Sequence, residues 1–235
     1  MTALFPGAIG VSHLRVYDSE GPDGLRGGTP HLHTACTEAY AVVAGRGAVQ
    51  TLSADGFQET PIQAGSFVWF GPGTVHRLVN LDGGLEIFVL MANAGLPEAG
   101  DMVLTLPPEV LADPDTYAEA AVLPAEAATT AADDLAVRRR KDRAVAGFLA
   151  LKEGGAEALA AFHAQAASLV GPRVEAWRQV WANGPHAEAE LVGRQLAQLA
   201  AGDPGIMRDA AVHALPPPPA ERRYGCCGTL GTYLP

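Results

Sequence analysis

The sequence predicts a mainly β plus α protein, with an antiparallel β unit over about residues 10–105 and an α-helical region over about 106–215. Two observations carry this prediction. Short apolar segments separated by glycine-rich turns fill the first part, and alanine-rich segments of helical length fill the second. A last stretch, 216–235, begins with a run of prolines, which disfavour helix and central strand, so we treat it as a Pro-rich tail.

The β unit is expected to contain six short strands. They are VSHLRVY at 11–17, TEAYAVVA at 37–44, GAVQTLS at 47–53, SFVWF at 66–70, VHRLVN at 75–80 and LEIFVLMA at 85–92. The turns between them include ADG at 54–56, AGS at 64–66, GPG at 71–73 and DGG at 82–84. Many short strands with closely spaced turns are typical of an antiparallel sandwich or small barrel.

A first helix of the α-helical region is expected over residues 131–153. Residues 131–153 have acids near their start and precede Gly154-Gly155, as in a helix with a favourable dipole and a glycine stop. Further helices are expected at about 156–169, 172–183 and 187–201, divided by GPR, NGP and GDPG. Acids balance the bases in this region, so we interpret the run RRRKDR at 138–143 as a solvated helix face.

Composition narrows the class of protein. Hydrophobic residues make up 48% of the 235 residues, which is enough for a buried core. The net charge of −10 comes from the first part, where acids outnumber bases and would repel phosphate backbones. The N-terminus does not resemble a signal peptide and no apolar run has the length of a membrane span, so we expect a cytoplasmic protein with neither nucleic acid nor membrane as partner. Cys36, Cys226 and Cys227 give no disulfide framework, so free thiols are expected.

Three histidines and one glutamate form the pattern that points to chemistry. Residues i and i+2 of a strand share a face, so His31 and His33 can send both imidazoles into one space. Glu38 opens the next strand and shares its face with Tyr40, and a buried carboxylate there needs a metal ion or a hydrogen-bonded cation. His76 opens the strand after the GPG turn. Nitrogen and oxygen donors of this kind suit a divalent transition metal.

This pattern resembles the two motifs of the cupin superfamily. The first, His-x-His, three or four residues, Glu, six residues and Gly, is matched by His31, His33, Glu38 and Gly45. The second is matched in spacing by Gly65, Gly73, His76 and Asn80. Gly71 stands where the family has proline, with Pro72 beside it, and Leu25, next to Gly24, stands where a glycine is expected. These departures affect turns rather than the four ligand positions.

The resemblance covers about residues 10–95 and implies a cupin β-barrel, also called a double-stranded β-helix or jelly roll. It implies one divalent transition metal ion on His31, His33, Glu38 and His76, with Fe(II) as first choice and Mn, Ni, Zn or Cu as alternatives. It also implies a homodimer, because cupins commonly pair through exposed sheet edges.

The leading functional expectation is a metal-dependent, dioxygenase-like oxidoreductase that acts on a small oxygenated organic molecule. Isomerase or lyase chemistry at the same centre is the second. A small-molecule binding or sensory module, in which the helices transmit occupancy, and a storage or structural cupin are the alternatives from other classes.

The sequence also suggests roles for two possible catalytic residues, two aromatic residues and the C-terminal segment. Tyr40 and Asn80 are candidate catalytic residues because strand alternation can turn both toward the interior, although core or turn positions suit them equally. Phe67 and Trp69 are expected to pack against helices or a partner subunit. The segment 221–235 is expected to pack near the mouth of the β unit, of its own chain or of a partner subunit, on account of its Tyr, Gly and Cys content.

Overall fold

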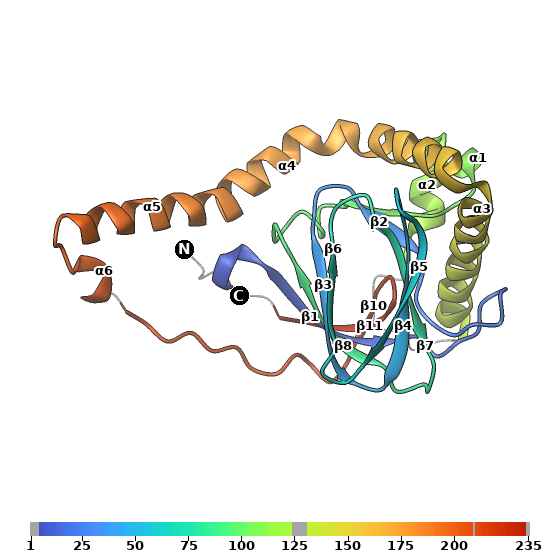
Figure 1. Cartoon of the computed structure of the whole chain (residues 1–235), viewed down its shortest axis with the longest axis horizontal. Helices are drawn as coiled ribbons and strands as arrows, with labels where there is room; N and C mark the ends of the chain where they lie inside the picture. The colour runs from blue at the N-terminus through green and yellow to red at the C-terminus, as the bar shows by residue number, and fades with distance from the viewer. Residues whose placement is uncertain (1–4, 124–130, 209, 234–235) are drawn as a thin grey trace.

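The computed structural model describes residues 5–123, 131–208 and 210–233. Residues 124–130, 209 and 234–235, which belong to the predicted helical region and tail, lie outside the described residues. The predicted order, a β part followed by helices, is confirmed (Figure 1). A final pair of strands after the helices was not predicted.

The strands form two antiparallel sheets. Their bounds are β1 (Gly10–Val16), β2 (His31–His33), β3 (Glu38–Ala44), β4 (Arg46–Ser53), β5 (Gly56–Gln63), β6 (Phe67–Phe70), β7 (Val75–Asn80), β8 (Glu86–Met91), β9 (Met102–Leu104), β10 (Arg223–Tyr224) and β11 (Gly228–Tyr233). The first sheet has the order β10-β11-β1-β8-β3-β6 and the second the order β5-β4-β7-β2-β9. All six strands expected from the apolar segments are therefore present.

The two sheets face each other as a sandwich and do not close into the expected barrel. No backbone ladder joins the two sheets within the described residues. The chain crosses from one sheet to the other at turns, as between β5 and β6, so strands that are consecutive in sequence do not pair there. Alternate residues of β3 are buried, which turns Glu38, Tyr40 and Val42 into the space between the sheets, as predicted.

A glycine is required where β3 ends. Gly45 has a φ of 76°, and a Cβ there would lie 2.4 Å from the backbone of Gly84. Only glycine combines this left-handed conformation with such a close approach. The last residue of the first motif therefore fixes the turn into β4.

The helices follow the β part in the chain; the first of them lie beside the strands and the last extend beyond them (Figure 1). Their bounds are α1 (Pro108–Leu111), α2 (Pro114–Ala121), α3 (Ala131–Val170), α4 (Val174–Trp181), α5 (Ala187–Ala200) and α6 (Gly205–Arg208), with 3₁₀ turns at Pro6–Ala8 and Gly171–Arg173 and a π turn at Ala182–His186. The predicted glycine stop is a kink at Gly155 within α3. The GPR and NGP segments change the helix type without ending the helical run.

Helix α3 packs on the strands of the second sheet. The ring of Phe148 contacts that of Phe57 on β5, at a centroid distance of 6.5 Å, and the guanidinium of Arg77. Arg140 and Lys141 are buried, so the interpretation of the run 138–143 as a solvated face is wrong for these two residues. Lys141 donates hydrogen bonds to the loop after β1 and Arg140 to backbone carbonyls, which compensates the burial of their charges.

The outward aromatic side chains of β6 are not covered by this chain. Phe67 is 56% exposed and Trp69 is 67% exposed, so packing against the chain's own helices is wrong for them. In the part of the chain that the structure describes, no helix combines the length and the apolar character needed to cross a membrane.

Candidate metal centre

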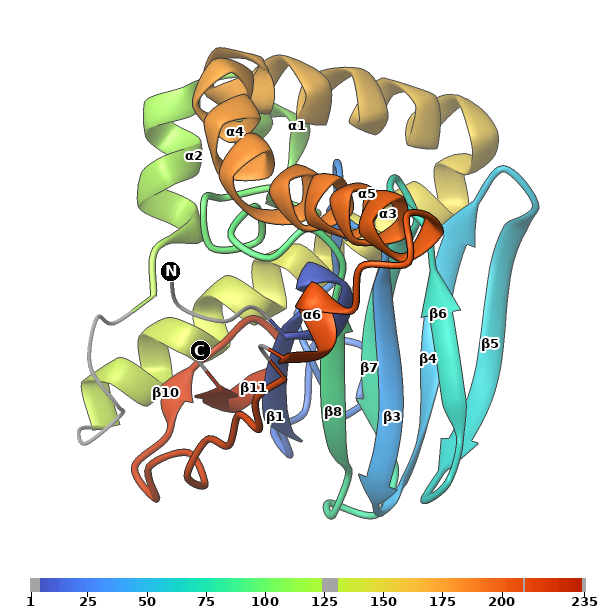
Figure 2. The same ribbon diagram turned by 90° about the vertical axis from the view of Figure 1, so that its left-hand side faces the viewer.

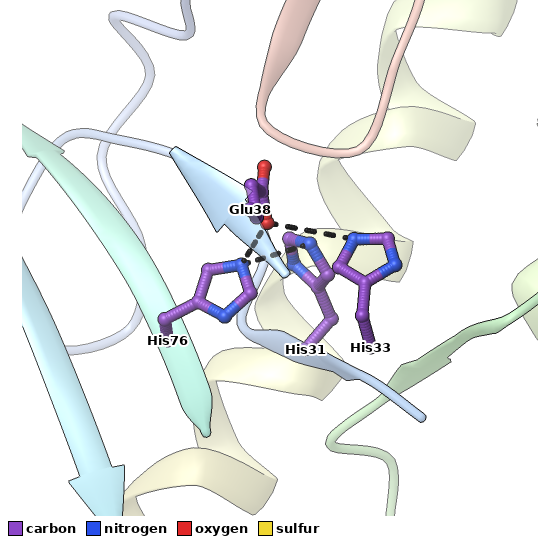
Figure 3. Close-up of side chains that lie close together, drawn as sticks. All are labelled: His31, His33, Glu38 and His76. Atoms are coloured by element: carbon purple, nitrogen blue, oxygen red, sulfur yellow. Dashed lines mark hydrogen bonds and ion pairs between the residues drawn. The ribbon is translucent and has the colours of Figure 1, made fainter. Parts of the chain in front are cut away.

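The four side chains singled out in the sequence converge between the two sheets (Figure 3). His31 and His33 come from β2 and His76 from the adjacent β7, where His31 and His76 are directly opposed in the antiparallel register. Glu38 comes from β3 of the facing sheet. All four are buried, and their potential ligand atoms lie within 4.8 Å of one another.

The distances leave room for an ion but for little else. Nε2 of His76 lies 3.1 Å from Nε2 of His31 and 3.0 Å from Oε2 of Glu38. Nε2 of His33 lies 3.5 Å from the same carboxylate oxygen. That oxygen is buried and has no hydrogen-bond partner, which is costly unless a cation compensates it.

The hydrogen bonds made by Nδ1 of each histidine determine which ring nitrogen faces the centre of the cluster. Each imidazole donates a hydrogen bond from its Nδ1. His31 donates to Thr29 O at 2.9 Å, His33 to Asp101 Oδ1 at 2.7 Å and His76 to Thr74 O at 3.0 Å. These acceptors keep the Nδ1 proton, so the Nε2 lone pairs are directed inward in the neutral rings. Three nitrogens and one carboxylate oxygen so arranged fit a divalent transition metal ion.

The electrostatics of the cluster favour an ionised carboxylate. Burial raises the pKa of Glu38, but the neighbouring imidazoles, His76 first, outweigh burial and lower it to about 2. Burial and the neighbouring His31 lower the pKa of His76. Burial also lowers the pKa of His31, yet the charges of Cys226 and Glu38 outweigh it and raise the pKa to about 9. Because a metal ligand must be a neutral imidazole, the raised pKa of His31 means that protons compete with a metal ion at this residue.

Asp101 is a residue of the candidate site that the sequence did not indicate. It is 0% exposed, and besides His33 its carboxylate accepts a hydrogen bond from the backbone N–H of Ala35 at 3.2 Å. Burial raises its pKa, but the hydrogen bond and the charge of His33 outweigh burial and lower it. It directly precedes β9, whose residue Met102 pairs with His33, and that short strand has no pattern in the sequence that would have located it.

The two candidate catalytic residues lie in different surroundings. Tyr40 is buried and lines the cavity beside the cluster, with its ring centroid 6.3 Å from that of His76. Burial and then the charge of Glu38 hold its pKa well above the ordinary value, so its hydroxyl keeps its proton. Asn80 donates to Val16 O at 3.2 Å and accepts from the N–H of Gly83 at 2.9 Å, so its side chain supports a turn.

A cavity of about 570 Å³ opens beside the cluster. His31, His33 and Glu38 form part of its wall. The rest is mainly apolar, with Ile9, Val11, Val89, Met91, Met102 and Leu230 among the lining residues. No lysine or arginine of the described residues lines it, and Glu98 is the acidic side chain there besides Glu38. Such a cavity suits a small molecule whose polar atoms face the cluster and whose remaining surface is apolar.

The C-terminal strands complete this wall. Cys226, Cys227 and Leu230 line the cavity, and Sγ of Cys226 lies 3.4 Å from Nδ1 of His31. The described part of the segment 221–235 therefore packs at the cavity of its own chain, as expected, and its two cysteines are free thiols.

Comparison with known proteins shows which domain family part of this chain matches. The cupin domain model matches residues 21–92, and no curated protein matches the chain. Among solved structures, Streptomyces Pac13 with uridine, described as a nucleoside dehydratase, is 18% identical over 43% of this chain and 70% of its own, with a TM-score of 0.32. The Campylobacter jejuni TDP-quinovose 3,4-ketoisomerase WlaRB is 12% identical over 35% and 60%, with a TM-score of 0.29. KdgF from Halomonas is 22% identical over 28% and 57%, with a TM-score of 0.26. Residues 21–92, which contain all four clustered side chains, are therefore identified as a cupin domain.

Proposed function

We propose that this chain is a metal-dependent enzyme that acts on a small oxygenated organic molecule. The observation that carries the proposal is the convergence of three inward Nε2 atoms on a buried, unpartnered carboxylate oxygen at the wall of a cavity. A purely structural metal site is closed by its ligands, whereas this cluster adjoins about 570 Å³ of space. His31, His33, Glu38 and His76 are the proposed metal ligands, and Fe(II) is the first choice.

A divalent ion held there supplies a Lewis acid for a substrate oxygen and, if it is iron, redox chemistry with O₂. The chain's own groups do the rest. The apolar wall excludes water from the reacting molecule, and the cavity accepts a substrate with adjacent oxygen donors such as a keto acid or diol. Asp101 holds the ring of His33 in place through its hydrogen bond to Nδ1.

Oxygenation is the leading reaction, and isomerase or lyase chemistry is the second. Tyr40 favours the second, because a protonated phenol at the cavity wall can donate a proton or a hydrogen bond to a substrate oxygen. A Tyr40→Phe variant is expected to retain its metal and to lose about 10²–10⁴-fold in turnover if the hydroxyl acts as a general acid. Equal turnover of the variant and the wild type would assign Tyr40 to packing alone.

The metal assignment is tested by anaerobic loading with Fe(II) followed by iron analysis. We expect about one iron per wild-type chain and strongly reduced iron in His33→Ala, because one of four donors is lost. His186→Ala is the matched control, since this half-buried histidine lies outside the cluster and pairs with Glu190. Equal iron in the wild type and His33→Ala would contradict the assignment.

The reaction class is tested on the iron-loaded protein with small keto acids, diols and diketones. Oxygen uptake measured with an electrode supports an oxygenase, whereas a product of unchanged mass, or one formed by loss of water, supports the isomerase or lyase alternative. Nitric oxide serves as a probe of the open coordination position through the electron paramagnetic resonance of the Fe(II) adduct. A loaded protein that binds ligand and changes its assembly without turnover would instead favour the sensory module.

A further inference from the structure

We infer that the C-terminal hairpin builds a second, thiolate-rich metal site from Cys226, Cys227 and Nδ1 of His31. The site lies behind the ring of His31, on the side opposite to the Nε2 atom that faces the first centre. It takes a thiophilic ion such as Zn²⁺, and it goes beyond the proposed function because no ligand of the first centre other than His31 belongs to it.

The two cysteines form the tip of a hairpin that is anchored in the β part. Strands β10 and β11 are joined through Cys226 and Cys227, and β11 pairs along its length with β1 (Figure 2). The carbonyl of Cys226 accepts a hydrogen bond from Thr29 N at 3.3 Å, and that of Cys227 accepts one from Tyr17 N at 3.0 Å. The carbonyl of Gly225 accepts one from the hydroxyl of Tyr17 at 2.9 Å. The positions of the thiols therefore follow from a fixed backbone.

The two sulfurs and Nδ1 of His31 all lie within 4.8 Å of one another, close enough to hold one ion. Nδ1 of His31 lies 3.4 Å from Sγ of Cys226 and 3.9 Å from Sγ of Cys227. With metal–sulfur and metal–nitrogen bonds of about 2.3 and 2.0 Å, tetrahedral ligands lie roughly 3.3 to 3.8 Å apart. The carbonyl of Thr29 lies 3.7 and 3.6 Å from the two sulfurs and is placed to be the fourth ligand.

The donor set selects the class of ion. Two thiolates and an imidazole favour zinc and other soft ions over magnesium, calcium or manganese, which prefer oxygen. The ion replaces protons of its ligands, among them the Nδ1 proton that His31 donates to Thr29 O, so its binding releases protons. His31 then bridges two ions through its two nitrogens, and occupancy of the thiolate site changes the basicity of its Nε2.

The test uses Co²⁺ as a spectroscopic probe on full-length protein that has been stripped of metal and reduced with a phosphine. Thiolate ligation gives Co²⁺ an intense near-ultraviolet charge-transfer absorption, which nitrogen and oxygen ligands do not give. We expect the wild type to bind two Co²⁺ and to show this absorption. The double variant Cys226→Ser/Cys227→Ser should lose the absorption and one of the two ions.

Two further variants separate the sites. Glu38→Gln removes the carboxylate of the first centre and should retain the thiolate absorption, so failure of the first centre is distinguishable from failure of the second. Cys36→Ser is the matched control for loss of a buried thiol outside the hairpin and should retain both ions. Absence of the absorption in the wild type, or its persistence in the double serine variant, would overturn the proposal.

A measurement on unmodified protein keeps the test valid if the double variant does not fold, as judged by circular dichroism. X-ray absorption spectroscopy of the wild type loaded with Zn²⁺ is expected to show sulfur neighbours at about 2.3 Å. A zinc environment of nitrogen and oxygen alone would overturn the site.

Discussion

The carboxylate of Asp101 accepts a hydrogen bond of 2.7 Å from Nδ1 of His33, a residue 68 positions earlier in the chain. Asp101 is fully buried, and its backbone carbonyl also accepts hydrogen bonds from the N–H and the hydroxyl of Thr34. The aspartate therefore fixes both the strand that carries the histidines and the tautomer of one of them. Such a carboxylate behind a histidine ligand raises the basicity of the nitrogen that faces the metal.

Replacing Asp101 is expected to weaken metal binding without emptying the first centre. In Asp101→Asn the hydrogen bond to His33 loses its charge, and we expect a loss of about 10–100-fold in affinity for Fe(II). Competition with a chelator of known affinity measures this. Asp18→Asn is the control, because Asp18 forms an exposed ion pair with Arg26 outside the cluster. Identical affinities for Asp101→Asn and the wild type would remove Asp101 from the metal centre.

The close packing of the C-terminal hairpin against the β part requires a glycine at position 28. A Cβ at Gly28 would lie 2.6 Å from Cβ and 2.7 Å from Sγ of Cys227. We expect Gly28→Ala to displace the hairpin tip and to destabilise the fold by about 1–3 kcal/mol, because a well-packed site cannot accept the extra methyl group. A chromogenic disulfide reagent should then modify Cys226 and Cys227 faster than in the wild type.

The control for this variant is Gly71→Ala, since a Cβ at Gly71 meets nothing within 4 Å and its φ is not positive. Urea denaturation gives the stability difference and the reagent gives the modification rate. Unchanged rates in Gly28→Ala would mean that the hairpin tip adapts to the added methyl group.

The sequence predicted those strands in which apolar residues form a regular pattern along the chain. Strand β3 alternates buried and partly buried residues, so the inward direction of Glu38 and Tyr40 followed from its period of two. Strand β5 is exposed at all but a few positions and contains Pro61, so it has no such alternation and was missed. The cluster of three histidines and Glu38 was predictable because the resemblance to the cupin motifs placed His76 with the first three residues.

The rest of the site depends on contacts between distant segments. Cys226 lies 195 positions after His31, and the prolines before it predicted a tail rather than a strand. Asp101 and Cys226 both contact histidines of β2 from segments whose strands are too short or too irregular to be recognised. Asn80 matched the second motif, yet its local hydrogen bonds to Val16 and Gly83 assign it to a turn.

Tyr117 links helix α2 to β9, and its ionisation is expected to lower the free energy of unfolding at alkaline pH. Its hydroxyl accepts a hydrogen bond of 3.0 Å from Leu104 N, and burial raises its pKa to about 12. The folded state therefore favours the protonated phenol. This contribution to the free energy of unfolding is fully present below the ordinary pKa of about 10 and is lost as the pH rises through about 12.

The comparison of Tyr117→Phe with the wild type isolates this group from the other tyrosines and the lysines. At neutral pH we expect the variant to be less stable by about 1 kcal/mol, because one hydrogen bond is lost. This difference should shrink as the pH rises above about 10, because only the wild type has a buried phenol whose ionisation lowers the free energy of unfolding. Denaturant titrations across this range measure it, and a difference that is constant with pH would contradict the assignment.

The exposed face of β6 is where we expect two copies of the chain to pair. Strand β6 lies at the edge of its sheet, and Phe67 and Trp69 project from it at 56% and 67% exposure. An edge strand with exposed aromatic side chains is a ready site for association. We therefore expect a homodimer that Trp69→Glu converts to monomer, measured by light scattering after gel filtration. Leu196→Glu is the matched control, because Leu196 on α5 is 62% exposed and lies far from β6 in sequence. A monomeric wild type, or dissociation by Leu196→Glu and not by Trp69→Glu, would rule out this interface.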